Sequence, residues 1–196
     1  MHGLSLLFVL CLFGGFSHGN LNSIPGEHRK HETQTSVNIK ENKFSVEITV
    51  TQTSAYCGGI RPSPELLNEL QNPKPLVRKK LFIKRGDKNL FNSKIVIEAC
   101  TDSSGKIQLQ LLPGKYFIVD ELKKDTSYYK TLIRKYSKAS KNYSAIEKGC
   151  LKSWYEQPDM VFEITNSDIK NLSLNFHKLC DWKEIPCIQF IGPLPQ

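Results

Sequence analysis

The sequence predicts a mostly β protein, an antiparallel β-sandwich of about seven strands with a helical insertion. Three observations predict it. Short runs of alternating apolar and polar residues recur along the chain, turn sequences rich in Gly, Pro, Asn and Asp separate them, and one later stretch has apolar residues at helical spacing. Alternation with a period of two buries one face of each strand, so we expect two sheets to pack these faces against each other.

The first 19 residues, MHGLSLLFVLCLFGGFSHG, contain no Asp, Glu, Lys or Arg and end in small residues. This pattern is typical of a secretory signal peptide, with cleavage before Asn20. Its apolar core, residues 4–13, is too short to span a bilayer. Cys11 leaves a lipoprotein signal as an alternative, although it lies inside the apolar core and does not follow a small residue. We therefore expect an exported protein, periplasmic or extracellular, without a transmembrane segment in the mature chain.

The mature chain is expected to hold a polar, flexible leader at 20–42 and a single sandwich domain at 43–196. All 27 Lys and Arg residues follow the signal peptide, so the net charge of +8 belongs to the mature chain. This excess favours anionic partners. The alternative is that the lysines, which are spread along the chain, only keep it soluble.

The first strand is predicted at FSVEITVTQT, where Phe44, Val46, Ile48 and Val50 share one face. A loop follows and holds a short helix that begins at Pro64. Four β-rich runs come next, separated by the turn sequences GDKN and DSSG and by Pro-Gly. These runs and the two strands expected after the insertion are 79–86, 93–100, 105–112, 115–122, 159–165 and 171–177.

The stretch TDSSGKIQLQLLPGKY, at 101–116, predicts a turn, a strand and a second turn. Gly105 ends the first turn, and Pro113 and Gly114 reverse the chain before the next strand. Tyr116 at such a corner is expected to pack its ring and to donate its hydroxyl to nearby backbone. We interpret these four residues as structural.

The helical insertion is predicted at about 126–155, where Tyr129, Leu132, Ile133 and Tyr136 have helical spacing. Tyrosines and lysines mix there in a way that suits sugars, acidic polymers or a protein partner. The alternative is that the aromatic residues cap the sandwich and the lysines form its solvated face. The residues that we single out for partner binding are Tyr129, Arg134, Lys135, Tyr136, Lys138, Lys141 and Trp154.

Five cysteines remain after the signal peptide, and export allows them to form disulfides. Cys180 and Cys187 bracket a short loop, so we expect them to pair, which leaves Cys57 with Cys150 and Cys100 as a buried free thiol. The pairing of Cys57 with Cys187 and of Cys150 with Cys180 is the alternative.

The sequence offers little for catalysis or for metal binding. Cys57 precedes two glycines, whose amides would suit an oxyanion, so a cysteine hydrolase with His177 as its base is the enzyme alternative. His28 and His31 have metal-ligand spacing but fall in the leader, and the chain contains no CxxC or HExxH pattern. We predict no catalytic residue, no metal and no cofactor.

The sequence TDSSGKIQLQLLPGKYFIV, with KPLVRKKLFIKRG upstream, resembles the carboxypeptidase regulatory-like and transthyretin-like modules, which are prealbumin-like, or Ig-like, β-sandwiches. The resemblance covers about positions 74 to 120 and implies a fold rather than an activity. Transthyretin-like hydrolases carry active-site histidines and an arginine, with a C-terminal Tyr-Arg-Gly-Ser, whereas this sequence ends in IGPLPQ and has only His28, His31 and His177 after the signal peptide. We therefore expect neither this activity nor that of a metallocarboxypeptidase, whose catalytic domain the sequence does not show.

The segments TQTSAYCGGIRPSPELL, CLKSWYEQP and CDWKEIPCIQFIGPLPQ resemble small exported proteins of Bacteroidota, which implies a bacterial envelope setting. Together these observations predict a non-catalytic, exported binding or envelope-associated module. Its partner is expected to be an anionic glycan or an envelope protein, not a specific nucleic acid, and the sequence does not indicate an oligomeric state.

Overall fold

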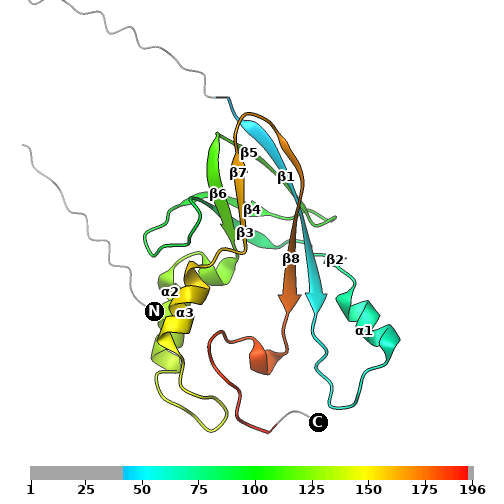
Figure 1. The fold of residues 1–196 in the computed structure, drawn as a ribbon, viewed down its shortest axis with the longest axis vertical. Coiled ribbons are helices and arrows are strands. Elements are labelled where there is room, and N and C mark those ends of the chain that lie inside the picture. The colour runs from blue at the N-terminus through cyan, green and yellow to red at the C-terminus, as the bar shows by residue number, and fades with distance from the viewer. Residues whose placement is uncertain (1–41, 194–196) are drawn as a thin grey trace, which may run out of the picture. The chain divides into compact units, whose positions relative to one another are not determined.

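The computed structural model describes residues 42–193. The signal peptide, the lipoprotein alternative at Cys11 and nearly all of the expected leader therefore lie outside the described residues. Within residues 42–193, eight strands form two four-stranded sheets whose apolar faces pack against each other (Figure 1). This arrangement confirms the predicted β-sandwich with a helical insertion.

The first sheet is built around β1, Phe44–Ser54. On one side, β1 pairs antiparallel with β5, Lys106–Leu111, and then with the two residues of β2, Lys74–Pro75. On its other side, it pairs with β8, Ile169–Lys178, and the two strands run parallel (Figure 1). This pair departs from the antiparallel expectation, because β8 follows a strand of the other sheet and enters beside β1 in the same direction.

The second sheet has the order β4-β3-β6-β7, and all its pairs are antiparallel. Its edge strands are β4, Ile95–Cys100, and β7, Met160–Ile164. The central strands are β3, Lys80–Arg85, and β6, Gly114–Val119. They are buried on both faces, because the sandwich core lies on one side and the helical insertion packs against the other.

Alternate residues of the strands form the sandwich core. From the first sheet, Val46, Ile48 and Val50 are fully buried, which matches the face predicted for this strand. Other strands contribute a second set to the same cluster: Leu81, Ile83, Ile107, Leu109, Leu111, Tyr116, Ile118, Phe162, Ile164 and Leu174. Burial of these apolar side chains is the main stabilising contribution to the sandwich.

The stretch 101–116 contains the turn before β5, the whole of β5, and the turn that leads into β6. Asp102 Oδ1 accepts hydrogen bonds from the backbone N–H groups of Ser104 and Lys106, each at 2.8 Å. Gly105 has a φ of 75°, and a Cβ atom there would lie 2.6 Å from the carbonyl oxygen of Val50, so a side chain would clash with backbone. Beyond β5, the hydroxyl of Tyr116 donates to the carbonyl oxygen of Leu112 at 3.0 Å.

The helical insertion lies between β6 and β7 in the sequence. It consists of a 3-10 turn, Glu121–Lys123, and two helices that lie side by side, α2, Thr126–Lys135, and α3, Lys148–Glu156 (Figure 1). The Asp125 side chain caps α2 by accepting from the N–H of Ser127 at 2.7 Å, and the Glu147 carboxylate caps α3.

Two further segments flank the first sheet. The helix α1, Pro64–Gln71, begins at the predicted proline and is capped by Ser63, but none of its residues is buried. The C-terminal tail leaves β8 through a 3-10 turn, Asp181–Lys183, and returns to the helical insertion, where Phe190 forms a β-bridge with Tyr143. The tail therefore connects the end of the sandwich to the insertion.

Candidate functional site

Two disulfides connect the tail to the loop after β1 and to the helical insertion. Cys57 bonds to Cys180, with the Cα atoms 5.5 Å apart, and Cys150 bonds to Cys187, with the Cα atoms 5.7 Å apart. The four cysteines are those that the sequence singled out, but both the expected pairing and its alternative are wrong.

The correct pairing follows from the parallel pairing of β1 with β8. The register places Ser54 opposite Lys178. Cys57 and Cys180 follow these strand ends by two or three residues, so they lie next to each other. The tail then passes the turn 181–183 and reaches α3, where Cys187 meets the helical Cys150. The two tail cysteines therefore meet different neighbours, although their closeness in sequence favoured a bond between them.

The hydrolase alternative required a free thiol at Cys57, and the structure contradicts it. A sulfur atom in a disulfide is not available as a nucleophile. The expected base, His177, lies on β8, where its Nδ1 is 3.0 Å from the hydroxyl oxygen of Thr53. The Cys57 region is therefore a structural crosslink.

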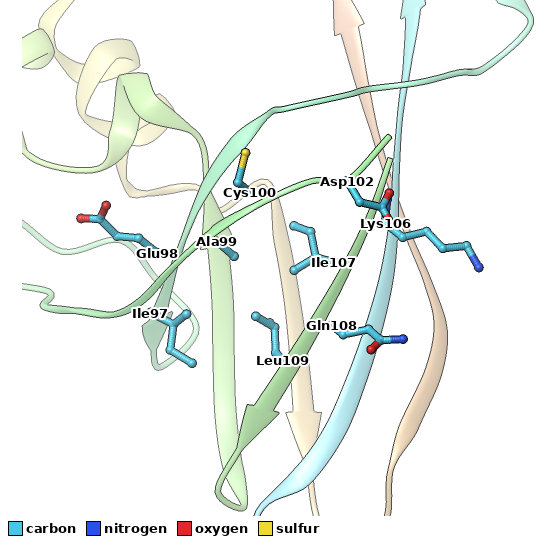
Figure 2. A pocket seen from close by; sticks show the side chains of 9 residues that line it. All are labelled: Ile97, Glu98, Ala99, Cys100, Asp102, Lys106, Ile107, Gln108 and Leu109. Carbon is cyan, nitrogen blue, oxygen red and sulfur yellow. The ribbon is translucent and has the colours of Figure 1, made fainter. Parts of the chain in front are cut away.

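Cys100 is a free thiol, as expected, but it is exposed rather than buried. It ends β4, an edge strand, and lies at an open groove of about 530 Å³ between β4 and β5. Figure 2 shows Ile97, Ala99, Ile107 and Leu109 pointing into the space between these strands, whereas Glu98 and Gln108 point away. The thiol was expected inside because its run, KIVIEAC, is strongly apolar, but an edge strand leaves part of such a run exposed.

The aromatic residues of the insertion form a second small core. Leu132, Tyr136, Ile146 and Leu151 are its buried members, and further aromatic rings pack against them. Tyr136 and Tyr143 meet edge to face, with centroids 5.7 Å apart. Of the residues predicted for partner binding, the structure places Tyr136 inside this core, with 8% of its surface exposed, and Tyr129 and Trp154 half-buried against it.

The other residues predicted for partner binding are exposed on and after α2. We use the name basic segment for Lys130, Arg134, Lys135, Lys138 and Lys141. Within residues 42–193, none of them has a carboxylate oxygen within 4.0 Å. Lys135 instead lies over the ring of Tyr136, with Nζ 5.0 Å from its centroid. The structure thus separates the predicted set into packed aromatic rings and exposed cations.

A buried polar cluster that was not predicted joins the insertion to the sandwich. Lys84 Nζ donates to Asn89 Oδ1 at 2.7 Å, and both residues are at most 1% exposed. Asn89 Nδ2 donates to the carbonyl oxygens of Lys123 and Tyr155 at 2.9 and 3.0 Å, and its backbone N–H donates to that of Glu156. Burial lowers the pKa of Lys84. One asparagine therefore fastens both ends of the insertion to the β3–β4 loop.

A cavity of about 370 Å³ lies where β1, β8, the insertion and the tail meet, and we call it the junction cavity. Its lining combines aromatic, apolar and charged side chains. Lys79 Nζ is 4.9 Å from the ring centroid of Phe176 and 3.5 Å from Asp120 Oδ2. The lining residues are Gln52, Leu76, Lys79, Asp120, Leu122, Tyr128, Phe176, His177, Lys178, Leu179 and Glu184.

Burial raises the pKa of two acidic side chains, Tyr128 in the junction cavity and Asp159 beside Lys123. Burial raises the pKa of Tyr128, and the nearby Glu184 and Asp120 carboxylates raise it further. Burial also raises the pKa of Asp159, although Lys123 Nζ lies 2.7 Å from its Oδ1 and opposes the shift. The Tyr128 hydroxyl therefore remains a hydrogen-bond donor at neutral pH.

In the part of the chain that the structure describes, no group of three or more His, Cys, Asp or Glu side chains is arranged to hold a metal ion. His28 and His31 lie outside that part. No helix among residues 42–193 is long and apolar enough to cross a membrane. The two disulfides indicate a protein that folds in an oxidising compartment, outside the cytoplasm.

No protein family and no curated protein matches this chain. Solved structures with some similarity include the TIE protein of Bacillus anthracis, which is 15% identical over 69% of this chain and 17% of that chain, with a TM-score of 0.33. They also include the shaft pilin SpaA of Lactobacillus rhamnosus GG in a single-mutant and a double-mutant form, each 10% identical over 70% of this chain and 50% of that chain, with a TM-score of 0.34. This chain therefore spans at most half the length of these proteins.

The residues of the junction cavity and of the Lys84 cluster were not predicted from the sequence. Gln52, Phe176 and Glu184 come from three distant segments, and nothing in their local patterns marks them. Lys84 did carry a signal, because it is a charged residue at an apolar position of a central strand. Such a residue is buried only if it finds a polar partner.

Proposed function

We propose that this protein is a non-catalytic, exported module, periplasmic or extracellular, that binds an anionic glycan through its basic segment. Its β-sandwich, which resembles the carboxypeptidase regulatory-like and transthyretin-like modules in the stretch 101–119, acts as the scaffold. The helical insertion supplies the binding surface.

The observation that carries the proposal is a group of exposed cations without carboxylate partners on a rigid support. Between positions 126 and 150 the basic residues are Lys130, Arg134, Lys135, Lys138, Lys141 and Lys148, whereas Glu147 is the acidic residue. The Glu147 carboxylate is already used, since it accepts from the N–H groups at the start of α3. An anionic polymer that binds here therefore gains attraction without breaking existing ion pairs.

The support of the basic segment limits the entropy lost on binding. The aromatic core beneath it is buried, and Cys150–Cys187 ties the insertion to the tail. A preorganised surface loses less conformational freedom when it binds a partner than a flexible one does. The packed aromatic rings thus hold the binding surface in place, and the exposed lysines bind the glycan.

The test compares two triple charge reversals with the same change in net charge. Lys135→Glu/Lys138→Glu/Lys141→Glu should weaken the binding of polygalacturonate, used as a carboxylated glycan, by about tenfold or more at low salt. The control, Lys80→Glu/Lys94→Glu/Lys170→Glu, reverses exposed lysines on β3, before β4 and on β8. Binding is measured by biolayer interferometry at two salt concentrations.

Equal weakening by the two variants would mean that only net charge matters, and it would overturn the proposal. Unchanged binding by the first variant would show that these lysines are merely solvated. Absence of polygalacturonate binding by the wild type would also overturn the proposal and would leave an envelope protein as the alternative partner.

A further inference from the structure

The junction cavity contains polar side chains with unused hydrogen-bonding capacity. Within residues 42–193, no hydrogen bond or ion pair engages the amide of Gln52, the hydroxyl of Tyr128 or the carboxylate of Glu184. They come from β1, α2 and the tail. Polar groups that converge on one cavity from three elements are the usual means of orienting a small ligand.

The same cavity has aromatic and apolar walls. Phe176 and Tyr128 are half-buried, and Leu76, Leu122 and Leu179 complete the apolar part of the lining. A sugar ring presents C–H groups that pack on aromatic surfaces and hydroxyls that both donate and accept hydrogen bonds. A carboxylate accepts from such hydroxyls, and an amide or a neutral tyrosine completes the pairing.

The cavity is next to the basic segment along α2. Lys135 follows Tyr128 by seven residues, which is close to two helical turns, so it lies on the same side of α2 about 10 Å further along. The two side chains are close enough for the Lys135 charge to lower the pKa of Tyr128 against the larger effect of burial. A polymer with one unit in the cavity therefore passes the cations with its neighbouring units.

We infer that the junction cavity seats one sugar ring of the anionic glycan whose charged groups bind the basic segment. This inference rests on the proposed function. It explains why the protein would prefer a glycan to polyanions that contain no sugar ring. The volume of about 370 Å³ lies near the lower end of the range of small-molecule sites, which suits a single ring.

The test removes two polar groups of the cavity and keeps its shape. Tyr128→Phe/Gln52→Leu is compared with Tyr143→Phe/Gln108→Leu, which removes the same chemical groups away from the cavity. The probes are polygalacturonate and inorganic polyphosphate, a polyanion without sugar rings. The cavity variant should bind polygalacturonate about tenfold more weakly, as expected for the loss of two hydrogen bonds, and should bind polyphosphate as the wild type does.

The outcomes separate this inference from the proposed function. Unchanged polygalacturonate binding by the cavity variant, or equal weakening for both polymers, overturns the cavity assignment and leaves the basic segment as the binding surface. Wild-type binding of polyphosphate but not of polygalacturonate overturns the cavity assignment and also the glycan as the proposed ligand. If the wild type binds neither polymer, the proposed function and the cavity assignment both fail. Equal loss in the matched control would also overturn the assignment.

Discussion

The stretch 101–116 and the helical insertion are held in place by interactions of different range. In the first, Asp102 bonds to residues within four positions of itself, and the Tyr116 hydroxyl reaches back four residues to Leu112. In the second, Asn89 bonds to backbone groups up to 67 positions away, those of Lys123, Tyr155 and Glu156, and a disulfide joins Cys150 to a residue 37 positions later.

The turns of the sandwich and the candidate binding surface on the insertion therefore depend on different kinds of interaction. Local hydrogen bonds specify the turns of the sandwich, so the residues of each turn favour its conformation directly. The insertion belongs to neither sheet and relies on long-range contacts, among them the Asn89 hydrogen bonds, the β-bridge to the tail and the Cys150–Cys187 disulfide. Each of these contacts should therefore carry more of the free energy of unfolding than a single contact of the turns.

The largest expected effect is that of Asn89→Ala, which should lower the free energy of unfolding by about 4 kcal/mol. The substitution leaves the buried Lys84 ammonium without an acceptor and removes the donors of two buried carbonyl groups. Urea unfolding followed by tryptophan fluorescence measures the change.

Asn92→Ala, in the same loop but exposed, is the matched control and should change stability by less than about 0.5 kcal/mol. Lys84→Met/Asn89→Leu should recover part of the loss, because an apolar pair carries no unpaired charge. Similar losses for the two asparagines would contradict the role of Asn89 as the long-range fastening.

Removal of the Cys150–Cys187 bond shows whether the insertion unfolds separately from the sandwich. Cys150→Ser/Cys187→Ser should lower stability by about 3 kcal/mol, since the bond closes a chain segment with a separation of 37 residues. Hydrogen exchange should speed up in peptides from 126–156 and stay unchanged in peptides from 101–119, if the two regions open separately. Equal acceleration in both would show that the insertion and the sandwich unfold as one unit.

The same difference in range explains what the sequence could predict. Alternation predicted the inward residues Val46, Ile48 and Val50, and turn chemistry predicted the corners, because these features depend on neighbours in the chain. The disulfide pairing was wrong because it depends on the parallel pairing of β1 and β8, more than 120 residues apart. Cys100 was expected inside because a single strand does not reveal whether it forms an edge.

The candidate site also contains a part that the sequence predicts, the basic segment, and a part that it does not, the junction cavity. The basic segment was predicted from composition. Its cations are exposed because Leu132 and Tyr136 occupy the buried face of this part of the insertion. The junction cavity was not predicted, because Gln52, Tyr128 and Glu184 belong to three segments that are far apart in the sequence and meet only in the folded chain. No local pattern carries that information.

Tyr116→Phe tests the contribution of one side-chain hydroxyl in the stretch 101–116 and should lower the free energy of unfolding by about 1 kcal/mol. It removes the hydrogen bond to Leu112 and the contact with Arg85, whose Nη2 lies 3.3 Å from the hydroxyl, but it keeps the ring stacked on Phe162. Tyr143→Phe is the control, since its hydroxyl has no hydrogen-bond partner among the described residues. Thermal unfolding of both variants measures the difference, and a loss near that of Asn89→Ala would contradict the contrast between the regions.

The smallest effects are those of two aspartates with opposite pH dependence, Asp102 in the stretch 101–116 and Asp159, which pairs with Lys123 of the insertion. Hydrogen bonds from Lys106 and Ser104 hold the pKa of Asp102 below its usual range. Its charge therefore stabilises the fold above the unfolded pKa, and this contribution is lost as the pH falls through the folded value. Asp102→Asn keeps the acceptor oxygen, so its deficit relative to the wild type should be present at pH 7 and shrink toward pH 3.

Asp159 should show the reverse, because burial raises its pKa in the folded state. Its contribution is present below the unfolded pKa and is lost as the pH rises through the folded value, so the deficit of Asp159→Asn should be larger at pH 3 than at pH 7. Urea midpoints of both variants and the wild type, measured between pH 3 and pH 7, give the two slopes. Slopes of the same sign would mean that Lys123 compensates fully for the burial of Asp159, so that the long-range ion pair is as well satisfied as the local turn at Asp102.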